Sequence, residues 1–174
     1  MNGGASSTAS NLVDEDEETR VLFLGRALPR ASGAERIAWS AVLVGLLLVL
    51  GIATRLSPDP RGVGTHEQLR ALGLPPLPPC GFLAATGWPC PSCGYTTTFA
   101  LAAHGRWIAA FVNQPMGFLV FLGFCAGVPI SLGAVVRGFS PAKASDAWPW
   151  RTIFVVFLAL WIAGWVYKAG VLHA

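Results

Sequence analysis

The stretch IAWSAVLVGLLLVLGIAT, residues 37–54, decides the fold, because it is uncharged and mostly apolar between Arg36 and Arg55. As an α-helix, 18 residues rise about 27 Å, close to the hydrocarbon thickness of a bilayer. The stretch starts too far from the N-terminus, and is too long, to be typical of a cleaved signal peptide. We therefore expect a membrane-spanning helix that remains in the protein as an anchor.

The composition of the whole chain agrees with an integral membrane protein. Of its 174 residues, 53% are hydrophobic and 12% are charged, and the net charge is only +3. No basic block of five or more occurs, so we expect the lipid bilayer, and not nucleic acid, as the main partner. The sequence also has no nucleotide-binding loop, paired-carboxylate site or serine nucleophile elbow.

Two further spans are predicted, over residues 115–136 and 150–168. Asn113 is placed to cap the start of the second span, while Trp165 and Tyr167 are expected to anchor the third span at the membrane interface. No acidic residue lies within the three spans, which argues against a proton-driven pump.

The regions outside the spans are predicted to be polar and irregular. Residues 1–36 read as a largely disordered cytoplasmic tail, since the first 20 are mostly small or acidic and have little to bury. The remaining membrane domain, 37–174, contains a proline-rich aqueous loop over residues 55–79. Within this loop, Thr65 and Gln68 fit a capping box for a short surface helix.

Residues 80–103 are apolar enough to be counted as a fourth span, but the helix within the re-entrant segment, about 86–105, is too short to cross. A helix from Pro91 to His104 would rise about 21 Å, whereas a crossing needs about 30 Å. We expect a re-entrant or interfacial helix that returns to the side it came from. The predicted fold is therefore an all-α integral membrane protein with three transmembrane helices and one short re-entrant helix.

The distribution of positive charge predicts the orientation. With three spans, seven of the 12 lysines and arginines lie on the N-terminal side and five on the other, whereas a fourth crossing would leave six on each. Positive residues are retained on the cytoplasmic side, so the count favours a multi-pass protein of the inner membrane with its N-terminus in the cytoplasm. Cys80, Cys90 and Cys93 would then face the exterior, where disulfides persist.

The candidate site is the motif Cys90-Pro91-Ser92-Cys93-Gly94, preceded by Cys80. If Cys90 begins a helix, its thiolate is favoured by free backbone N–H groups and by the helix dipole. Cys90 would then be the nucleophile of a membrane thiol-disulfide oxidoreductase, Cys93 the resolving thiol and Cys80 a relay, with another membrane or envelope protein as partner.

Two other interpretations use the same cysteines. Zinc or copper binding would take Cys80, Cys90 and Cys93 as ligands, with His66 as the histidine that can reach them, because a straight helix carries His104 about 21 Å away. Alternatively, Cys80 forms a structural disulfide with one partner and leaves the other thiol inert. The pattern leaves these alternatives open, and the chain is not assigned as an enzyme.

The segment from Cys80 to Pro115 resembles a bacterial membrane-protein family catalogued as domain of unknown function 2752. The residues that carry the resemblance are Cys80, Thr86-Gly87, Cys90-Pro91-Ser92-Cys93-Gly94-Tyr95-Thr96, Gly105, Asn113 and Pro115. The sequence departs from the family pattern at Thr97, where an arginine is usual, and at Gln114, which separates Asn113 from Pro115. The resemblance supports a membrane location and the importance of the cysteine segment, but implies no substrate.

These observations predict a polytopic inner-membrane protein with a Cys-rich element at the outer face. That element is either structural or ligand-binding, and no cofactor is required unless the thiols hold zinc or copper.

Overall fold

The computed structural model describes residues 20–23, 26–73, 78 and 80–173 of the chain. By contacts the chain divides into two units. The first consists of residues 1–45 and 127–148, and the second of residues 46–126 and 149–174. Every residue of the candidate site belongs to the second unit.

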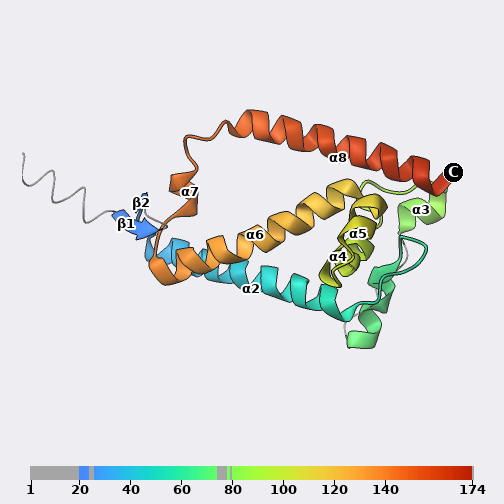
Figure 1. Ribbon diagram of the computed structural model, residues 1–174, viewed down its shortest axis with the longest axis horizontal. Coiled ribbons are helices and arrows are strands. Elements are labelled where there is room, and N and C mark those ends of the chain that lie inside the picture. Colours follow the sequence, from blue (N-terminus) through green and yellow to red (C-terminus); the bar gives the residue numbers. More distant parts are fainter. Residues whose placement is uncertain (1–19, 24–25, 74–77, 79, 174) are drawn as a thin grey trace, which may run out of the picture. The chain divides into compact units, whose positions relative to one another are not determined.

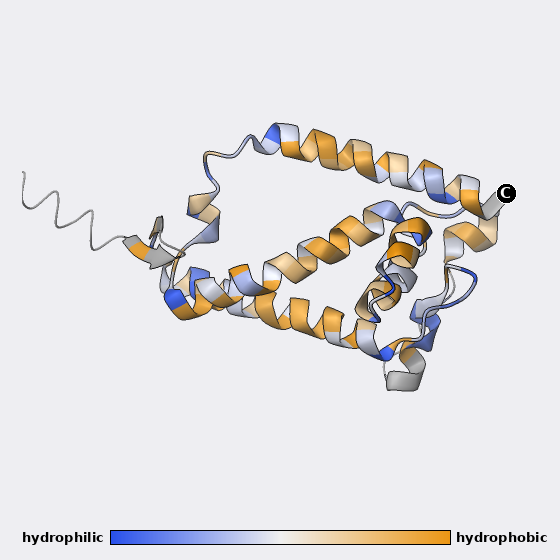
Figure 2. Ribbon diagram, in the orientation of Figure 1, coloured by the Kyte–Doolittle hydropathy of each residue, from blue (hydrophilic) through white to orange (hydrophobic). Residues whose placement is uncertain are grey.

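Three long helices confirm the three predicted spans (Figure 1). They are α2 (Gly33–Arg55), α6 (Pro115–Arg137) and α8 (Trp150–His173). All three are long and apolar enough to cross a membrane. Figure 2 shows hydrophobic residues along most of each helix. The observed helices extend the predicted spans by a few residues at one or both ends.

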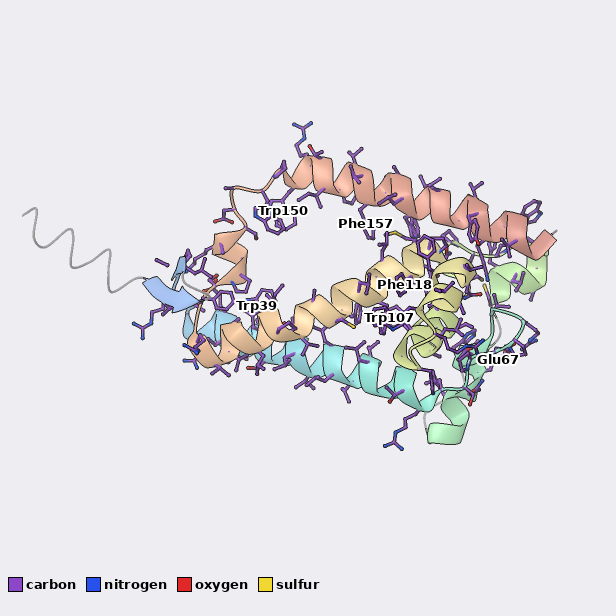
Figure 3. All side chains as sticks on the ribbon, viewed as in Figure 1. Trp39, Glu67, Trp107, Phe118, Trp150 and Phe157 are labelled. Carbon is purple, nitrogen blue, oxygen red and sulfur yellow. The ribbon has the colours of Figure 1, made fainter. Side chains whose placement is uncertain are left out.

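Most apolar side chains of the long helices are exposed on the protein. Phe157, labelled on α8 in Figure 3, keeps 46% of its surface exposed, and Trp150 at the start of the same helix keeps 52%. In water such a surface would be unfavourable, since each Å² of exposed apolar area costs about 25 cal/mol. Lipid chains are as apolar as these side chains, so the exposure is consistent with a bilayer environment.

In the first unit, a small hairpin precedes α2. Strands β1 (Arg20–Phe23) and β2 (Arg26–Pro29) pair antiparallel, and the chain after them is bound to the end of α6, where the Ala31 N–H donates to the Gly138 carbonyl at 2.7 Å. The prediction of a tail over 1–36 did not include this hairpin. Residues 1–19 of that tail lie outside the described residues.

The start of α2 is fixed by a charged contact. Glu35 accepts hydrogen bonds from the Ser32 backbone at 2.7 Å and from the Ser140 hydroxyl at 2.8 Å, and it pairs with Lys143 in the short helix α7 (Pro141–Ala144). These contacts connect α2 to α7 within the first unit.

In the second unit, four short helical elements follow α2 and precede α6 along the chain. They are the 3-10 helix η1 (Thr65–Leu72), α3 (Gly81–Thr86), α4 (Tyr95–Ala103) and α5 (Trp107–Asn113). Helices α4 and α5 pack against each other, joined by a tight turn in which Gly105 has a φ of +74°. At nine and seven residues they rise only about 14 and 10 Å, too little to cross a bilayer.

The helix predicted to begin at Pro91 starts four residues later. Gly94, with a φ of +89°, adopts the left-handed conformation directly before α4, so the chain from Cys90 to Gly94 forms a turn instead of a first helical turn. Helix α5, which was not predicted, brings the chain back alongside α4.

Aromatic rings and small residues form the core of the second unit. The Phe99 ring of α4 makes edge-to-face contacts with Phe121 and Phe124 of α6, with centroid separations of 5.4 and 5.3 Å. Ala110 of α5 is completely buried in the same cluster. Such aromatic pairs contribute about 0.5–1.5 kcal/mol beyond their buried area. They hold α4 against α6 and thereby fix the segment that carries the thiols.

Candidate functional site

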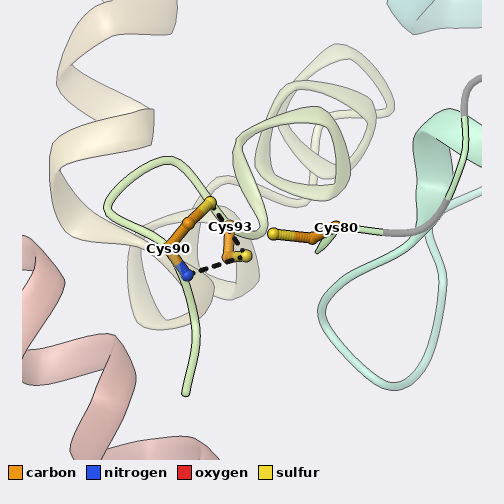
Figure 4. Close-up of side chains that lie close together, drawn as sticks. All are labelled: Cys80, Cys90 and Cys93. Carbon is orange, nitrogen blue, oxygen red and sulfur yellow. Dashed lines mark hydrogen bonds between the residues drawn. The ribbon is translucent and has the colours of Figure 1, made fainter. Parts of the chain in front are cut away.

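The structure brings three of the four cysteines together. Cys80 lies directly before α3, and Cys90 and Cys93 lie in the turn before α4. Their three sulfur atoms are within 4.8 Å of one another (Figure 4), and we call them the thiol cluster. Cys125, on α6, is exposed and is not part of the cluster. The three predicted site cysteines therefore meet, although ten residues separate Cys80 from Cys90.

The turn from Cys90 to Gly94 aligns two of the sulfurs. The Cys93 N–H donates to the Cys90 carbonyl at 3.0 Å, which closes the turn. In the opposite direction the Cys90 N–H donates to the Cys93 sulfur at 3.1 Å. The two Sγ atoms are 3.1 Å apart, longer than the ~2.05 Å of a disulfide bond, and both thiols are free.

The thiols differ in their electrostatic surroundings. The pKa of Cys80 falls from 9.0 to about 7, chiefly because the backbone N–H of Leu83 stabilises its thiolate. Burial raises the pKa of Cys93 to about 12, and its hydrogen bond with Cys90 acts in the same direction. The sequence predicted Cys90 as the activated thiol at a helix start. That geometry is absent, and Cys80 has the lowered pKa.

A cavity of about 530 Å³ opens onto the thiol cluster. Its lining also includes His66, Glu67 and Arg61. The Nε2 atom of His66 lies 3.1 Å from the Pro78 carbonyl oxygen, so this ring is engaged with the backbone and lies outside the group of converging ligand atoms. Arg61 pairs with Asp59 at 2.8 Å. His66 thus shares the cavity with the thiols, as the metal interpretation requires, without being directed at them.

Helix α8 holds the cysteine segment through polar side chains. The Trp165 indole N–H donates to the Pro89 carbonyl at 2.7 Å, immediately before Cys90, and the Tyr167 hydroxyl donates to the Val112 carbonyl at 2.7 Å. Both residues were expected to be interfacial anchors. In the structure each also satisfies a backbone carbonyl at the edge of the α4–α5 pair.

Lys168 of α8 is the buried cation of the site. Its side chain is 2% exposed, and its Nζ donates to the Gly62 carbonyl at 3.2 Å and to the Asn113 carbonyl and Oδ1 at 3.2 and 2.8 Å. From the sequence, Lys168 contributed only to the count of positive charges that predicts the orientation in the membrane. A lysine inside an otherwise apolar helix is itself a signal of a functional site, and that signal could have identified it.

Asn113 connects both ends of the α4–α5 pair. Its Nδ2 donates to the Gly94 carbonyl at 3.2 Å and to the Thr98 hydroxyl at 2.9 Å, both at the start of α4. It was predicted to cap α6, but it is the last residue of α5, and α6 begins two residues later at Pro115. The contact shows that the end of α5 lies next to the start of α4.

Thr97 has a structural role here. Its side chain is completely buried, and its hydroxyl lies 2.8 Å from that of Thr65 at the start of η1. Thr65 also accepts a hydrogen bond from the Asp59 N–H at 3.0 Å, while Gln68 bonds the backbone of Ser57. The predicted capping box is therefore wrong, because both side chains bind groups outside the helix.

The geometry of the thiol cluster is close to that of a thiolate metal site. With zinc–sulfur bonds of about 2.3 Å, two sulfurs of a tetrahedral site lie about 3.8 Å apart. The three sulfurs here lie within 4.8 Å of one another, with the shortest pair at 3.1 Å.

Comparison with known proteins agrees with the resemblance noted from the sequence. Residues 80–128 match the family model described as "Protein of unknown function (DUF2752)". The matched region contains the thiol cluster, α4, α5 and the first part of α6. Searches of curated proteins and of solved structures gave no match.

Proposed function

We propose that this multi-pass membrane protein binds a thiophilic metal ion, zinc(II) or copper(I), through Cys80, Cys90 and Cys93. The observation that carries the proposal is the convergence of three sulfur atoms within 4.8 Å from two separate segments of chain. Thiolates are the ligands that zinc and copper(I) prefer in proteins, and a chain that folds its cysteines together has already met most of the entropic cost of assembling such a site.

The surroundings of the thiol cluster support this function. The adjoining cavity gives access to an ion, and His66 in its lining offers a nitrogen ligand if it exchanges its contact with Pro78. Cys93 is 6% exposed, so an ion bound there would be shielded from water and from competing ligands.

We further propose that the cluster faces the exterior of the bacterial inner membrane, with the N-terminus in the cytoplasm. The excess of positive residues on the N-terminal side supports this orientation. Helices α4 and α5 then form the re-entrant element, since neither can cross and Asn113 returns the chain to Gly94. Backbone at this depth is tolerated because it packs against protein.

The test is metal retention by the full chain purified in detergent. Protein loaded with zinc(II), or with copper(I) under reducing conditions, is desalted, and its metal content is measured by mass spectrometry. We expect one ion per chain, and loss of that ion in Cys80→Ser, Cys90→Ser and Cys93→Ser. Cys125→Ser, which removes a thiol outside the cluster, is the matched control and should retain it. A wild-type protein that retains neither metal contradicts the proposal.

One observation favours a second function, thiol–disulfide exchange. Cys90 and Cys93 have their sulfurs 3.1 Å apart, so a short rotation would join them. In the exchange, one thiolate attacks the disulfide of a partner protein and releases one partner thiolate. The second thiol then resolves the mixed disulfide, so the pair is oxidised and the partner is reduced to its dithiol.

Equilibration in a glutathione redox buffer distinguishes exchange from metal binding. An exchange site should form the Cys90–Cys93 disulfide reversibly, with a measurable midpoint, and Cys90→Ser should abolish it. A disulfide to Cys80 that persists across the whole buffer range would instead identify a structural bridge. Mass mapping of alkylated peptides measures both outcomes.

A further inference from the structure

Lys168 has the features of a charge placed for a ligand. Lys168 as a whole residue is 2% exposed, yet the hydrogen bonds of its ammonium group go to two carbonyls and one amide oxygen, none of which is charged. Among the described residues, the ion pairs are Arg61–Asp59 and Lys143–Glu35, so no carboxylate there balances it. A buried charge without a counterion is costly, and such lysines in membrane helices are generally functional.

Snorkelling does not explain this side chain. Lysines near helix ends usually extend toward water at the membrane interface and keep the ammonium hydrated. Lys168 instead points into the protein, where its three N–H groups are taken by the Gly62 loop and by Asn113 at the end of α5. Its exposed fraction of 2% leaves no route to hydration.

The cysteine turn lies directly beside Lys168. A Cβ added to Gly94, the residue after Cys93, would lie 3.2 Å from the Lys168 Cε, so the lysine side chain packs against the end of this turn. Lys168 is not among the residues that line the cavity. A thiolate formed at Cys93 would therefore lie close to the buried ammonium group.

We propose that Lys168 is the counterion of the metal-loaded thiol cluster and biases the site toward copper(I) over zinc(II). This inference rests on the proposed metal binding. Three thiols that bind copper(I) release three protons, and the site becomes more negative by two charges. The same thiols binding zinc(II) make it more negative by only one. A fixed positive charge stabilises the more negative complex more strongly, because Coulomb energy scales with the product of the charges.

The expected signature is a difference between two affinities. Copper(I) and zinc(II) dissociation constants are measured on full-length protein in detergent by competition with chromophoric chelators. Lys168→Gln should weaken both metals, and the loss for copper(I), in powers of ten, should be at least about twice the loss for zinc(II). Lys168→Arg keeps the charge and should retain the wild-type ratio. Arg151→Gln removes an exposed charge from the same helix and is the matched control.

A second variant covers the case in which Lys168→Gln does not fold. Asn113→Asp places a carboxylate at the position of the Oδ1 atom, 2.8 Å from the Lys168 Nζ, and so neutralises the lysine inside the protein without removing it. It too should weaken copper(I) more than zinc(II). Equal losses for the two metals, or no loss, in either variant would show a purely structural lysine and overturn the inference. Wild-type protein that binds neither metal would instead refute the proposed function.

Discussion

Cys80 differs from Cys93 in a way that alkylation can measure. Its pKa is lowered to about 7 by the Leu83 N–H, whereas burial raises the pKa of Cys93 to about 12. A thiolate reacts and a thiol does not. In metal-free protein the alkylation rate of Cys80 should therefore reach half its maximum near pH 7 and fall about tenfold per pH unit below that. Cys93 should remain unmodified throughout this range.

Peptide mass spectrometry across a pH series provides the measurement, with each cysteine followed separately. Cys125 outside the cluster reports the reagent's own pH dependence. If the midpoint of Cys80 lay at the ordinary value of 9.0, the Leu83 contact would not exist in the protein.

Residue-level roles were the least predictable part of the site. The identity of the three cysteines followed from their spacing and chemistry, but the lowered pKa of Cys80 did not, because it depends on the backbone N–H of Leu83. The start of α4 was not predictable either, because the left-handed conformation of Gly94 sets it and a glycine's φ is not evident from composition. The partners of Lys168 and Asn113 were also hidden, since they join positions 55 residues apart.

At the scale of elements, the junction at the start of α4 should be sensitive to a single methyl group. Gly94 has a φ of +89°, and an added Cβ would lie 2.7 Å from the Gly62 carbonyl oxygen. Gly105 has a similar φ of +74°, but nothing lies within 4 Å of its Cβ position. Alanine at either glycine costs about 1–2 kcal/mol of backbone strain.

Gly94→Ala should cost more than Gly105→Ala, by about 1–3 kcal/mol, since the backbone of the Gly62 loop must also move. Thermal unfolding in detergent measures the difference as a larger fall in Tm for Gly94→Ala. Equal Tm values for the two variants would mean that the Gly62 loop does not contact the cysteine turn.

The accuracy with which the helices were predicted depended on their length. The three long helices were predicted to within five residues at each end, because 18 or more apolar residues between charges allow few other structures in a membrane. The short helices were predicted less well. Helix α5 was not predicted, and α4 was predicted to begin four residues before its observed start. Helices of seven to nine residues are marginal alone and exist here because they pack against each other and against α6.

For the whole molecule, the orientation proposal predicts which positions a membrane-impermeant maleimide reaches in intact cells. Residues 56–114 lie between α2 and α6 and therefore on one side, whereas α7 lies between α6 and α8 on the other. In a chain without other cysteines, Cys80 should be labelled from outside and a cysteine introduced by Ala144→Cys should be labelled only after permeabilisation.

The reverse pattern would invert the proposed orientation. Labelling of both positions from the same side would contradict the three-span arrangement itself, since an odd number of crossings separates them. Ala144 is exposed and Cys80 is partly exposed beside the cavity, and labelling of each variant after permeabilisation gives its full extent for comparison.

The central claim is that three cysteine sulfurs share one metal ion, and X-ray absorption at the zinc edge tests it most directly. Zinc-loaded protein should show three sulfur ligands at about 2.3 Å, completed by one nitrogen or oxygen. The spectrum of the Cys93→Ser variant should lose sulfur amplitude if any zinc remains bound. A first shell of nitrogen and oxygen alone would contradict the account.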